Sequence, residues 1–248
     1  MSRLIRRHRT YSWMVTAVLA AAASLTVALP AHGVRSASAK PPRTVIAVGF
    51  QPNSALYRIH PRTGRSKKIG PTGVQLTDVA DSAGTLYAIG FGTLYTLDAT
   101  TGAATLVGTL GVSNANALTK RPRSRTLFGA DQGGQLFTIN RHNGVAKVIG
   151  TFGSDLGSGG DLAFCRNRLY AAVVHQGSTA TLLARVNVHT GQATVIGRIG
   201  FHDVDGLFAA KGRLYGGTFQ GAILSISMRT GRGHRLSKTH LPLGGMTS

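Results

Sequence analysis

The sequence predicts an all-β fold, a five-bladed β-propeller built of four-stranded blades. The first observation is a repeat, because a segment of eighteen residues with a Thr-Gly or Asn-Gly turn occurs five times. The second is composition: the chain has 33 glycines and no glutamate, which favours short strands and turns over helices. The third is that the last residues of the chain supply a strand that the first repeat lacks.

Each recurring segment predicts the outer hairpin of one blade. Its turn needs a residue in the left-handed region before the second strand resumes, and glycine reaches that region without a Cβ clash. The turn glycines are 38, 42, 47 and 40 residues apart, which fits the roughly 40 to 45 residues of a four-stranded blade. In chain order the hairpins cover 56–73, 94–111, 136–153, 183–200 and 223–240, with turn glycines Gly64, Gly102, Gly144, Gly191 and Gly231.

Two inner strands precede each of the last four hairpins, in the segments 76–90, 115–131, 159–174 and 204–219. Each segment has a short apolar run, a polar turn and then a Leu-Tyr or Leu-Phe pair. We name the four strands of a blade A to D, from the axis outward. Neighbouring blades cover both faces of a blade, so mixed apolar patterning is expected in place of clean alternation.

The first blade lacks its strand A, because only the segment 44–50 precedes its hairpin. The stretch from Leu241 to Ser248 aligns with the strand A segments of the other blades. We therefore predict that this stretch completes the N-terminal blade and closes the ring. Closure of this kind removes the exposed edges that a linear stack of sheets would leave.

The first 39 residues predict an export signal, followed by a single propeller domain over 40–248. Four arginines near the start precede an apolar or small run over 13–29, and small-residue cleavage sites end at Gly33 and at Ala39. An uncleaved anchor is the alternative. The general secretory route and the twin-arginine route both stay open. We expect a secreted, extracellular protein, held at the cell envelope or free, and a monomer.

Cysteine and tyrosine residues predict core packing. Cys165 is the only cysteine and cannot form an internal disulfide, so we expect a buried, inert thiol. The tyrosines recur at equivalent repeat positions, as core residues do. They are Tyr57 and Tyr95 on strand C, and Tyr87, Tyr170 and Tyr215 on strand B.

The repeat resembles that of secreted bacterial β-propeller repeat proteins, whose units have the form LYxIDxxTGxxTxIGxxG. LYTLDATTGAATLVGTLG from Leu94 shows the pattern most fully. The resemblance extends from Arg43 to Ser248. It implies a propeller fold in an exported bacterial protein and implies no reaction, because several groups of these proteins have no characterised activity and a fold alone does not specify one.

No catalytic signature emerges from the chain. A glycosidase pair would have to be all-Asp, because the chain has no glutamate. The glycine cluster over 157–161 follows no strand-to-helix transition of the kind that binds phosphate. We therefore expect a non-enzymatic binding or scaffold protein, with a metal-dependent hydrolase or lactonase as the alternative.

A polar cluster supports that alternative. The D-to-A and B-to-C loops should open on one face around the central channel, where oxygen donors could hold a hard divalent cation such as calcium. The architecture then resembles gluconolactonase-type propellers, which bind a divalent metal at the channel mouth, although their Glu ligand has no counterpart here. The other interpretation is that these side chains accept hydrogen bonds from backbone N–H groups. The candidate ligands are Asp78, Asn116 and Asp161, aligned at the start of strand A, and Asp205, which precedes that position by one.

Basic residues should gather on the opposite face. The whole chain carries a formal charge of +20. Such a face attracts polyanions, so an anionic envelope polymer or membrane surface is the expected partner, and a merely solvated surface is the alternative. Sequence-specific nucleic-acid recognition is not expected, because no aromatic residues interleave with the arginines. The A-to-B turns contribute Lys120, Arg121, Arg123, Arg125, Arg166, Arg168, Lys211 and Arg213, and the C-to-D turns Arg62, Arg65, Arg141, Arg229 and Arg232.

Overall fold

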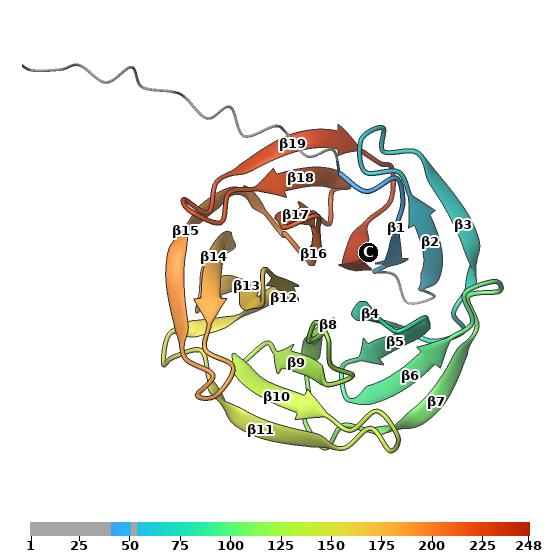
Figure 1. Cartoon of the computed structure of the whole chain (residues 1–248), viewed down its shortest axis with the longest axis horizontal. Helices are drawn as coiled ribbons and strands as arrows, with labels where there is room; N and C mark the ends of the chain where they lie inside the picture. Colours follow the sequence, from blue (N-terminus) through green and yellow to red (C-terminus); the bar gives the residue numbers. More distant parts are fainter. Residues whose placement is uncertain (1–40, 51–53) are drawn as a thin grey trace, which may run out of the picture. The chain divides into compact units, whose positions relative to one another are not determined.

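The computed structural model describes residues 41–50 and 54–248, and these form a ring of five four-stranded antiparallel sheets (Figure 1). The predicted five-bladed β-propeller is confirmed. Within these ranges every regular element is a strand, and no helix is long and apolar enough to cross a membrane. The predicted export signal over 1–39 lies outside the described residues.

The strands run from the axis outward in each blade. Blade 1 consists of β20 (Leu243–Thr247), β1 (Val45–Gly49), β2 (Ala55–Ile59) and β3 (Ser66–Pro71). Blade 2 consists of β4 (Asp78–Ser82), β5 (Thr85–Gly90), β6 (Thr93–Leu97) and β7 (Ala104–Thr109). Blade 3 consists of β8 (Ala115–Lys120), β9 (Leu127–Asp131), β10 (Gln135–Ile139) and β11 (Ala146–Thr151). Blade 4 consists of β12 (Leu156–Cys165), β13 (Arg168–His175), β14 (Ala180–Val186) and β15 (Ala193–His202), and blade 5 of β16 (Gly206–Ala210), β17 (Arg213–Gly217), β18 (Ala222–Ile226) and β19 (Gly233–Lys238).

Strand β20 closes the ring, as predicted. It pairs antiparallel with β1, with Ala47 opposite Met246 and Ile46 opposite Thr247. On its flanks β20 contacts β16 of blade 5 and β4 of blade 2. The last described strand of the chain therefore completes the first blade and joins it to both neighbours (Figure 1).

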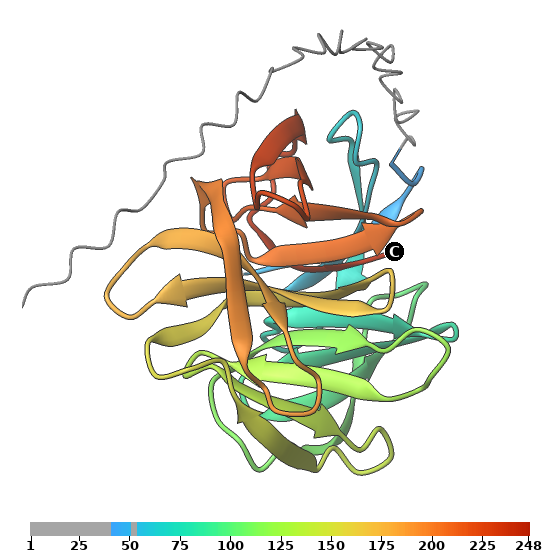
Figure 2. The ribbon, with the colours of Figure 1, turned by 60° about the vertical axis from the view of Figure 1, so that its left-hand side comes forward.

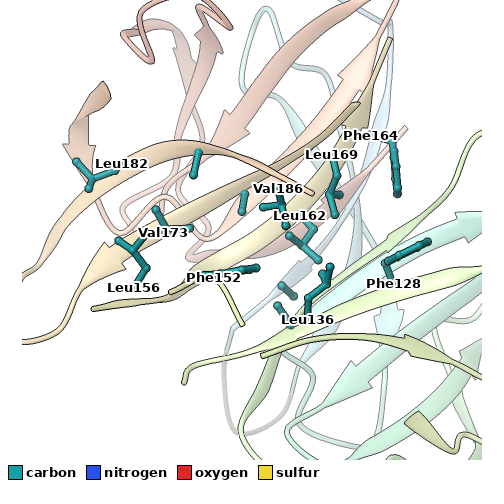
Figure 3. Close-up of a cluster of buried hydrophobic side chains, with 14 residues drawn as sticks. Phe128, Leu136, Phe152, Leu156, Leu162, Phe164, Leu169, Val173, Leu182 and Val186 are labelled. Carbon is teal, nitrogen blue, oxygen red and sulfur yellow. The ribbon is translucent and has the colours of Figure 1, made fainter. Parts of the chain in front are cut away.

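The hydrophobic core lies between adjacent blades. Figure 3 shows the cluster between blades 3 and 4, where Phe128 and Phe164 meet edge to face with ring centroids 5.4 Å apart. The strand B tyrosines and Cys165 are buried, as expected, and burial raises the pKa of the Cys165 thiol. Tyr57 and Tyr95 are partly buried against the core.

The glycines of the repeat have a packing reason that goes beyond their turn. Gly102 adopts φ of 81°, and a Cβ on it would lie 2.7 Å from the carbonyl oxygen of Gly70 in the preceding blade. A Cβ on Gly70 would in turn lie 1.8 Å from the carbonyl oxygen of Thr101. The C-to-D turn of one blade thus rests on strand D of the blade before it, which explains why the repeat contains glycine at both places.

Two faces of the ring follow from the antiparallel order. We call the side with the D-to-A and B-to-C loops the mouth face; its loops are 72–77, 91–92, 110–114, 132–134, 152–155, 176–179, 203–205, 218–221 and 239–242. The side with the A-to-B and C-to-D turns is the turn face; its turns are 60–65, 83–84, 98–103, 121–126, 140–145, 166–167, 187–192, 211–212 and 227–232. Blade 4 extends beyond the others at the mouth face, where Leu156 pairs with His175 and Ala180 with His202. Figure 2 shows its outermost strand, in orange, crossing the yellow strands nearer the axis.

Candidate functional site at the channel mouth

The innermost strands contribute two successive layers of residues around the axis. Strand register places Asp78, Ala117, Asp161, Gly206 and Gly245 at equivalent positions, which we call the inner layer. The alignment of Asn116 with Asp78 was wrong. An irregularity between Ala115 and Ala117 adds one residue to β8, and such a bulge shifts every side chain that precedes it. Asn116 therefore belongs to the preceding position, as Asp205 does.

Asp78 and Asp161 are fully buried and bind backbone N–H groups. Asp78 accepts hydrogen bonds from Val79 N–H at 2.6 Å and Leu118 N–H at 2.5 Å. Asp161 accepts them from Leu162 at 2.5 Å, Leu207 at 2.6 Å and Met246 at 3.4 Å. The five donors come one from each blade. Each innermost strand has an edge that faces the channel, so these carboxyl groups satisfy donors that no neighbouring strand reaches.

The two carboxyl groups also hydrogen-bond with each other, which requires a shared proton. Burial raises the pKa of Asp78 well above its usual value, and the neighbouring Asp161 raises it further. Burial raises the pKa of Asp161 to about 8, although the hydrogen bonds from Asp78 and the backbone oppose the shift. At neutral pH the pair of carboxyl groups therefore retains at least one proton.

The four residues predicted to bind a cation lie in two different layers around the axis. They are Asp78, Asn116, Asp161 and Asp205. The oxygens of the two inner-layer aspartates already bind backbone N–H groups, whereas Asn116 and Asp205 lie in the layer above. Among the described residues no three His, Cys, Asp or Glu side chains are grouped so that they could hold a metal ion. A cation on this set stays a prediction, and the geometry favours the hydrogen-bonding interpretation for Asp78 and Asp161.

The layer above the aspartates lines a pocket at the mouth face. Its five residues, one from each blade, are Thr77, Asn116, Gly160, Asp205 and Gly244, and all of them line a cavity of about 430 Å³ that we call the mouth pocket. Blade 4 supplies much of its wall through Ser158, Val174 and Thr181. Pockets of this size accommodate small organic molecules.

Asp205 is a titratable residue that lines the mouth pocket and whose pKa is shifted. Burial raises the pKa of its carboxyl to about 7, with a further contribution from the negative charge of Asp203. No described residue donates a hydrogen bond to it. Only glycine at position 160 permits the backbone of Asp205 to lie this close, because a Cβ on Gly160 would lie 2.4 Å from the Asp205 Cα. Asp203, at φ of 50°, is exposed and accepts a hydrogen bond from the Gln220 side chain at 2.7 Å.

Aromatic side chains also lie at the mouth pocket, and the sequence interpretation missed them. Phe50 packs edge to face on Phe91 and on Phe219, with centroids 6.5 and 6.3 Å apart. Phe50 and Phe91 line the mouth pocket, and Phe219 is 39% exposed beside them. All three lie at the end of strand B, in blades 1, 2 and 5: Phe50 and Phe91 follow directly on β1 and β5, and Phe219 follows β17 after one residue. The recurring endings AVGF, AIGF and GGTF were the signal that could have identified them.

The predicted basic residues lie in or beside the A-to-B turns of blades 3, 4 and 5. Lys120 ends β8, Arg121, Arg123 and Arg125 follow it, Arg166 precedes β13, which starts with Arg168, and Lys211 precedes β17, which starts with Arg213. Arg166 donates a hydrogen bond from Nε to the carbonyl of Gly212 at 3.0 Å, which ties two of these turns together. The described mouth-face loops contain no lysine or arginine.

Two grooves on the outer surface run beside basic turns. The groove on blade 3 has a volume of about 600 Å³ and is lined by Arg125, Arg141, His142 and Lys147. The groove on blade 4 has a volume of about 420 Å³ and is lined by Arg168 and Arg185. Neither groove is lined by an aspartate.

Comparison with known proteins supports the fold. No known protein family and no curated protein matches the chain in sequence. A chain in a crystal structure of a nidogen/laminin complex is similar with a TM-score of 0.53 at 12% identity, covering 82% of this chain and 84% of that chain. The crystal structure of a protein of unknown function from Bacteroides thetaiotaomicron is similar with a TM-score of 0.52 at 16% identity, covering 78% of this chain and 55% of that chain. At these identities the similarity establishes the β-propeller fold alone.

Proposed function

We propose that the protein is a non-enzymatic binding protein whose turn face attaches it to an anionic polymer of a cell envelope. The observation that carries this proposal is the distribution of basic residues. Lysine and arginine recur in the turns of the turn face and are absent from the described loops of the mouth face. A surface with a large excess of positive charge steers polyanions toward one orientation of the molecule.

The backbone of the basic turns supports a role for their side chains. Arg123, Arg166 and Lys211 adopt φ of 58°, 50° and 50°. This left-handed conformation costs a non-glycine residue about 1–2 kcal/mol, and turns of this geometry favour Asn, Asp or Gly. Basic side chains at such positions are held at the tips of the turns despite that cost. Outliers of this kind often accompany binding surfaces.

The chemistry of the grooves favours a flexible chain of phosphates or carboxylates as the ligand. Arginine pairs with such groups through two parallel N–H donors, and the grooves on blades 3 and 4 offer arginines along their length. No phenylalanine, tyrosine or tryptophan side chain lines either groove, so neither offers the usual platform for stacking of nucleobases. The resemblance of the repeat to secreted bacterial propellers, with the signal pattern in 1–39, supports export to a site where such polymers occur.

The proposal is tested by binding to vesicles and to a soluble polyanion as a function of salt. The probes are vesicles with and without an anionic lipid, and a poly(glycerol phosphate). Affinity should fall by about a thousand-fold or more between roughly 50 and 200 mM salt if six or more anionic contacts form. A flat response at low salt would contradict the proposal.

Two triple variants locate the contact. Replacing Arg121, Arg123 and Arg125 by Gln should lower the affinity and reduce the salt slope by up to about 3, since each phosphate contact contributes about one unit. The control replaces Lys67, Lys68 and Arg235, exposed residues of the outermost strands β3 and β19, and removes the same charge. Equal losses in the two variants would show an effect of net charge alone and would refute a specific turn face.

A further inference from the structure

The mouth pocket has a lining of one electrical sign. Asp203 and Asp205 line it, and no lysine, arginine or histidine does. Asp203 is engaged by Gln220, but the Asp205 carboxylate receives no hydrogen bond from the described residues. A carboxylate that is withdrawn from water without a partner is destabilising, and a bound cation would remove that cost.

Asn116 adds an acceptor in the same layer. Its Nδ2 donates to the carbonyl of Ser158 at 3.1 Å, which fixes the amide. Its Oδ1 is buried and has no partner among the described residues. Unsatisfied buried acceptors are rare in folded proteins and indicate a missing donor, such as water or a ligand N–H.

The lining of the pocket also includes two aromatic side chains, Phe50 and Phe91. Phe91 is held at φ of 50°. A bulky residue in the left-handed region is an outlier, and such strain persists where surrounding structure enforces it. The Phe91 carbonyl accepts a hydrogen bond from Ala115 N–H of the next blade at 2.6 Å, which supplies that enforcement.

A carboxylate, a neutral acceptor and aromatic side chains in one pocket favour one class of cation over another. A hard dication such as calcium takes six to eight oxygen ligands and gains nothing from an aromatic wall. An organic ammonium group pairs with one carboxylate, donates N–H bonds to neutral acceptors, and is attracted by aromatic ring faces. The mouth pocket offers the carboxylate of Asp205, the neutral acceptor of Asn116, and aromatic side chains. Its volume of about 430 Å³ fits a small organic molecule.

We propose that the mouth pocket binds a small organic cation, a primary ammonium group on an apolar body, with Asp205 as its anionic partner, Asn116 as a neutral acceptor, and Phe50 and Phe91 against the apolar body. This site is separate from the turn face and does not depend on attachment to a polyanion. It places cation recognition on the face that lacks basic loops.

Three probes of one shape test the charge requirement. Benzylamine, benzyl alcohol and benzoate are titrated into the purified protein at slightly alkaline pH, where the Asp205 carboxyl is ionised, and binding is followed by calorimetry and by NMR shifts. Benzylamine should bind at least about ten-fold more tightly than benzyl alcohol, since a charge-assisted hydrogen bond exceeds a neutral one by this margin. Benzoate should not bind in the pocket. Equal binding of amine and alcohol, or no amine binding, overturns the proposal.

Matched variants locate the site. Asp205→Asn keeps the shape of the side chain and should weaken benzylamine binding by about ten-fold or more. Asp98→Asn removes the same charge from the turn face, where asparagine already stands at the equivalent positions Asn140 and Asn187, and should leave binding unchanged. Phe50→Leu keeps an apolar wall without the ring and should weaken the amine more than the alcohol. Calcium chloride alone is the competing probe, and calcium binding that Asp205→Asn abolishes, without amine binding, would assign the pocket to a metal instead.

Discussion

Asp78 and Asp161 stand in blades 2 and 4, yet their carboxyl groups meet at the axis and together accept one backbone N–H from each of the five blades. Two side chains thus connect all five innermost strands. Along the innermost strands they lie between the residues that line the mouth pocket and those that line a smaller cavity of about 200 Å³, which include Val79, Leu118, Leu207 and Met246. Only blades 2 and 4 have an aspartate at this position, so the pair is not a feature of every repeat.

Removal of one member should strongly destabilise the fold. Asp78→Ala leaves the N–H groups of Val79 and Leu118 buried without an acceptor, which we expect to cost about 2–6 kcal/mol at 1–3 kcal/mol for each donor. Urea unfolding measures the loss. The exposed Asp98→Asn variant serves as control and should lose much less stability than Asp78→Ala, because asparagine already stands at the equivalent turn positions Asn140 and Asn187. A loss below about 1 kcal/mol for Asp78→Ala would contradict the connecting role.

The same pair should make the protein less stable as the pH rises. Both carboxyls have folded-state pKa values raised above the unfolded value of 3.8, and that of Asp161 reaches about 8. The folded state therefore binds more protons than the unfolded state between these values, so the contribution is fully present below pH 3.8 and is lost progressively as the pH rises through about 8. Asp205, with a pKa raised to about 7, acts in the same direction.

Guanidinium unfolding at mildly acidic and alkaline pH measures this dependence. The double variant Asp78→Asn with Asp205→Asn removes two of the three contributing groups, and its stability should change less with pH than that of the parent. An unchanged slope would show that other groups control it. Below pH 3.8 the opposite trend is expected from Asp98, whose pKa is lowered to about 2 by hydrogen bonds from Thr100 and Thr101.

Gly245 should tolerate no side chain. A Cβ there would lie 1.5 Å from Oδ1 and 2.4 Å from the Cα of Asp78, and the second clash involves backbone that cannot rotate away. We expect Gly245→Ala to cost more than about 4 kcal/mol or to prevent folding, as overpacking at a rigid contact does. Gly73→Ala is the matched control: Gly73 adopts φ of 75° with nothing within 4 Å of the added carbon, so only about 1–2 kcal/mol of backbone strain is expected. Thermal unfolding of the two variants distinguishes the outcomes.

Removal of the closing strand should open the ring, and its peptide should restore it. A chain that stops before Leu241 leaves the edge of β1 unpaired and uncovers Val45, Ala47 and Tyr215 of the adjoining core. We expect loss of cooperative unfolding, and recovery when a peptide of residues 241–248 is added, because strand addition satisfies the open edge. A peptide carrying Met246→Asp should fail, since Met246 is 2% exposed. Cooperative unfolding of the shortened chain without peptide would show that closure is dispensable.

The blade architecture was predictable because its determinants are local and repeated. The turn glycines define five hairpins, and the stretch after Leu241 matched strand A closely enough to predict closure. The faces of the ring followed from the antiparallel order alone. Residues near the axis were harder. Asp78 and Asp161 were correctly placed around the channel, but their partners belong to other blades, and no spacing along the chain records such a contact.

The error at Asn116 and the missed phenylalanines have identifiable causes. One extra residue in β8 moves Asn116 out of the inner layer, and a bulge leaves no mark in an apolar pattern. Phe50, Phe91 and Phe219 occur in only three blades, so they do not stand out as repeat residues. The proximity of Phe219 to Phe50 arises from closure, which brings the fifth blade beside the first.

The pairing of β20 with β1 also has a consequence while the ribosome synthesises the chain. The ribosome makes β1 before the other nineteen strands of the described chain and its inner partner last of all. Until β20 has been synthesised, the nascent chain has an unpaired edge strand, β1, and an exposed hydrophobic core beside it. Such an edge is a template for pairing with other molecules, so the newly made protein depends on rapid completion or on a chaperone that shields β1 until then.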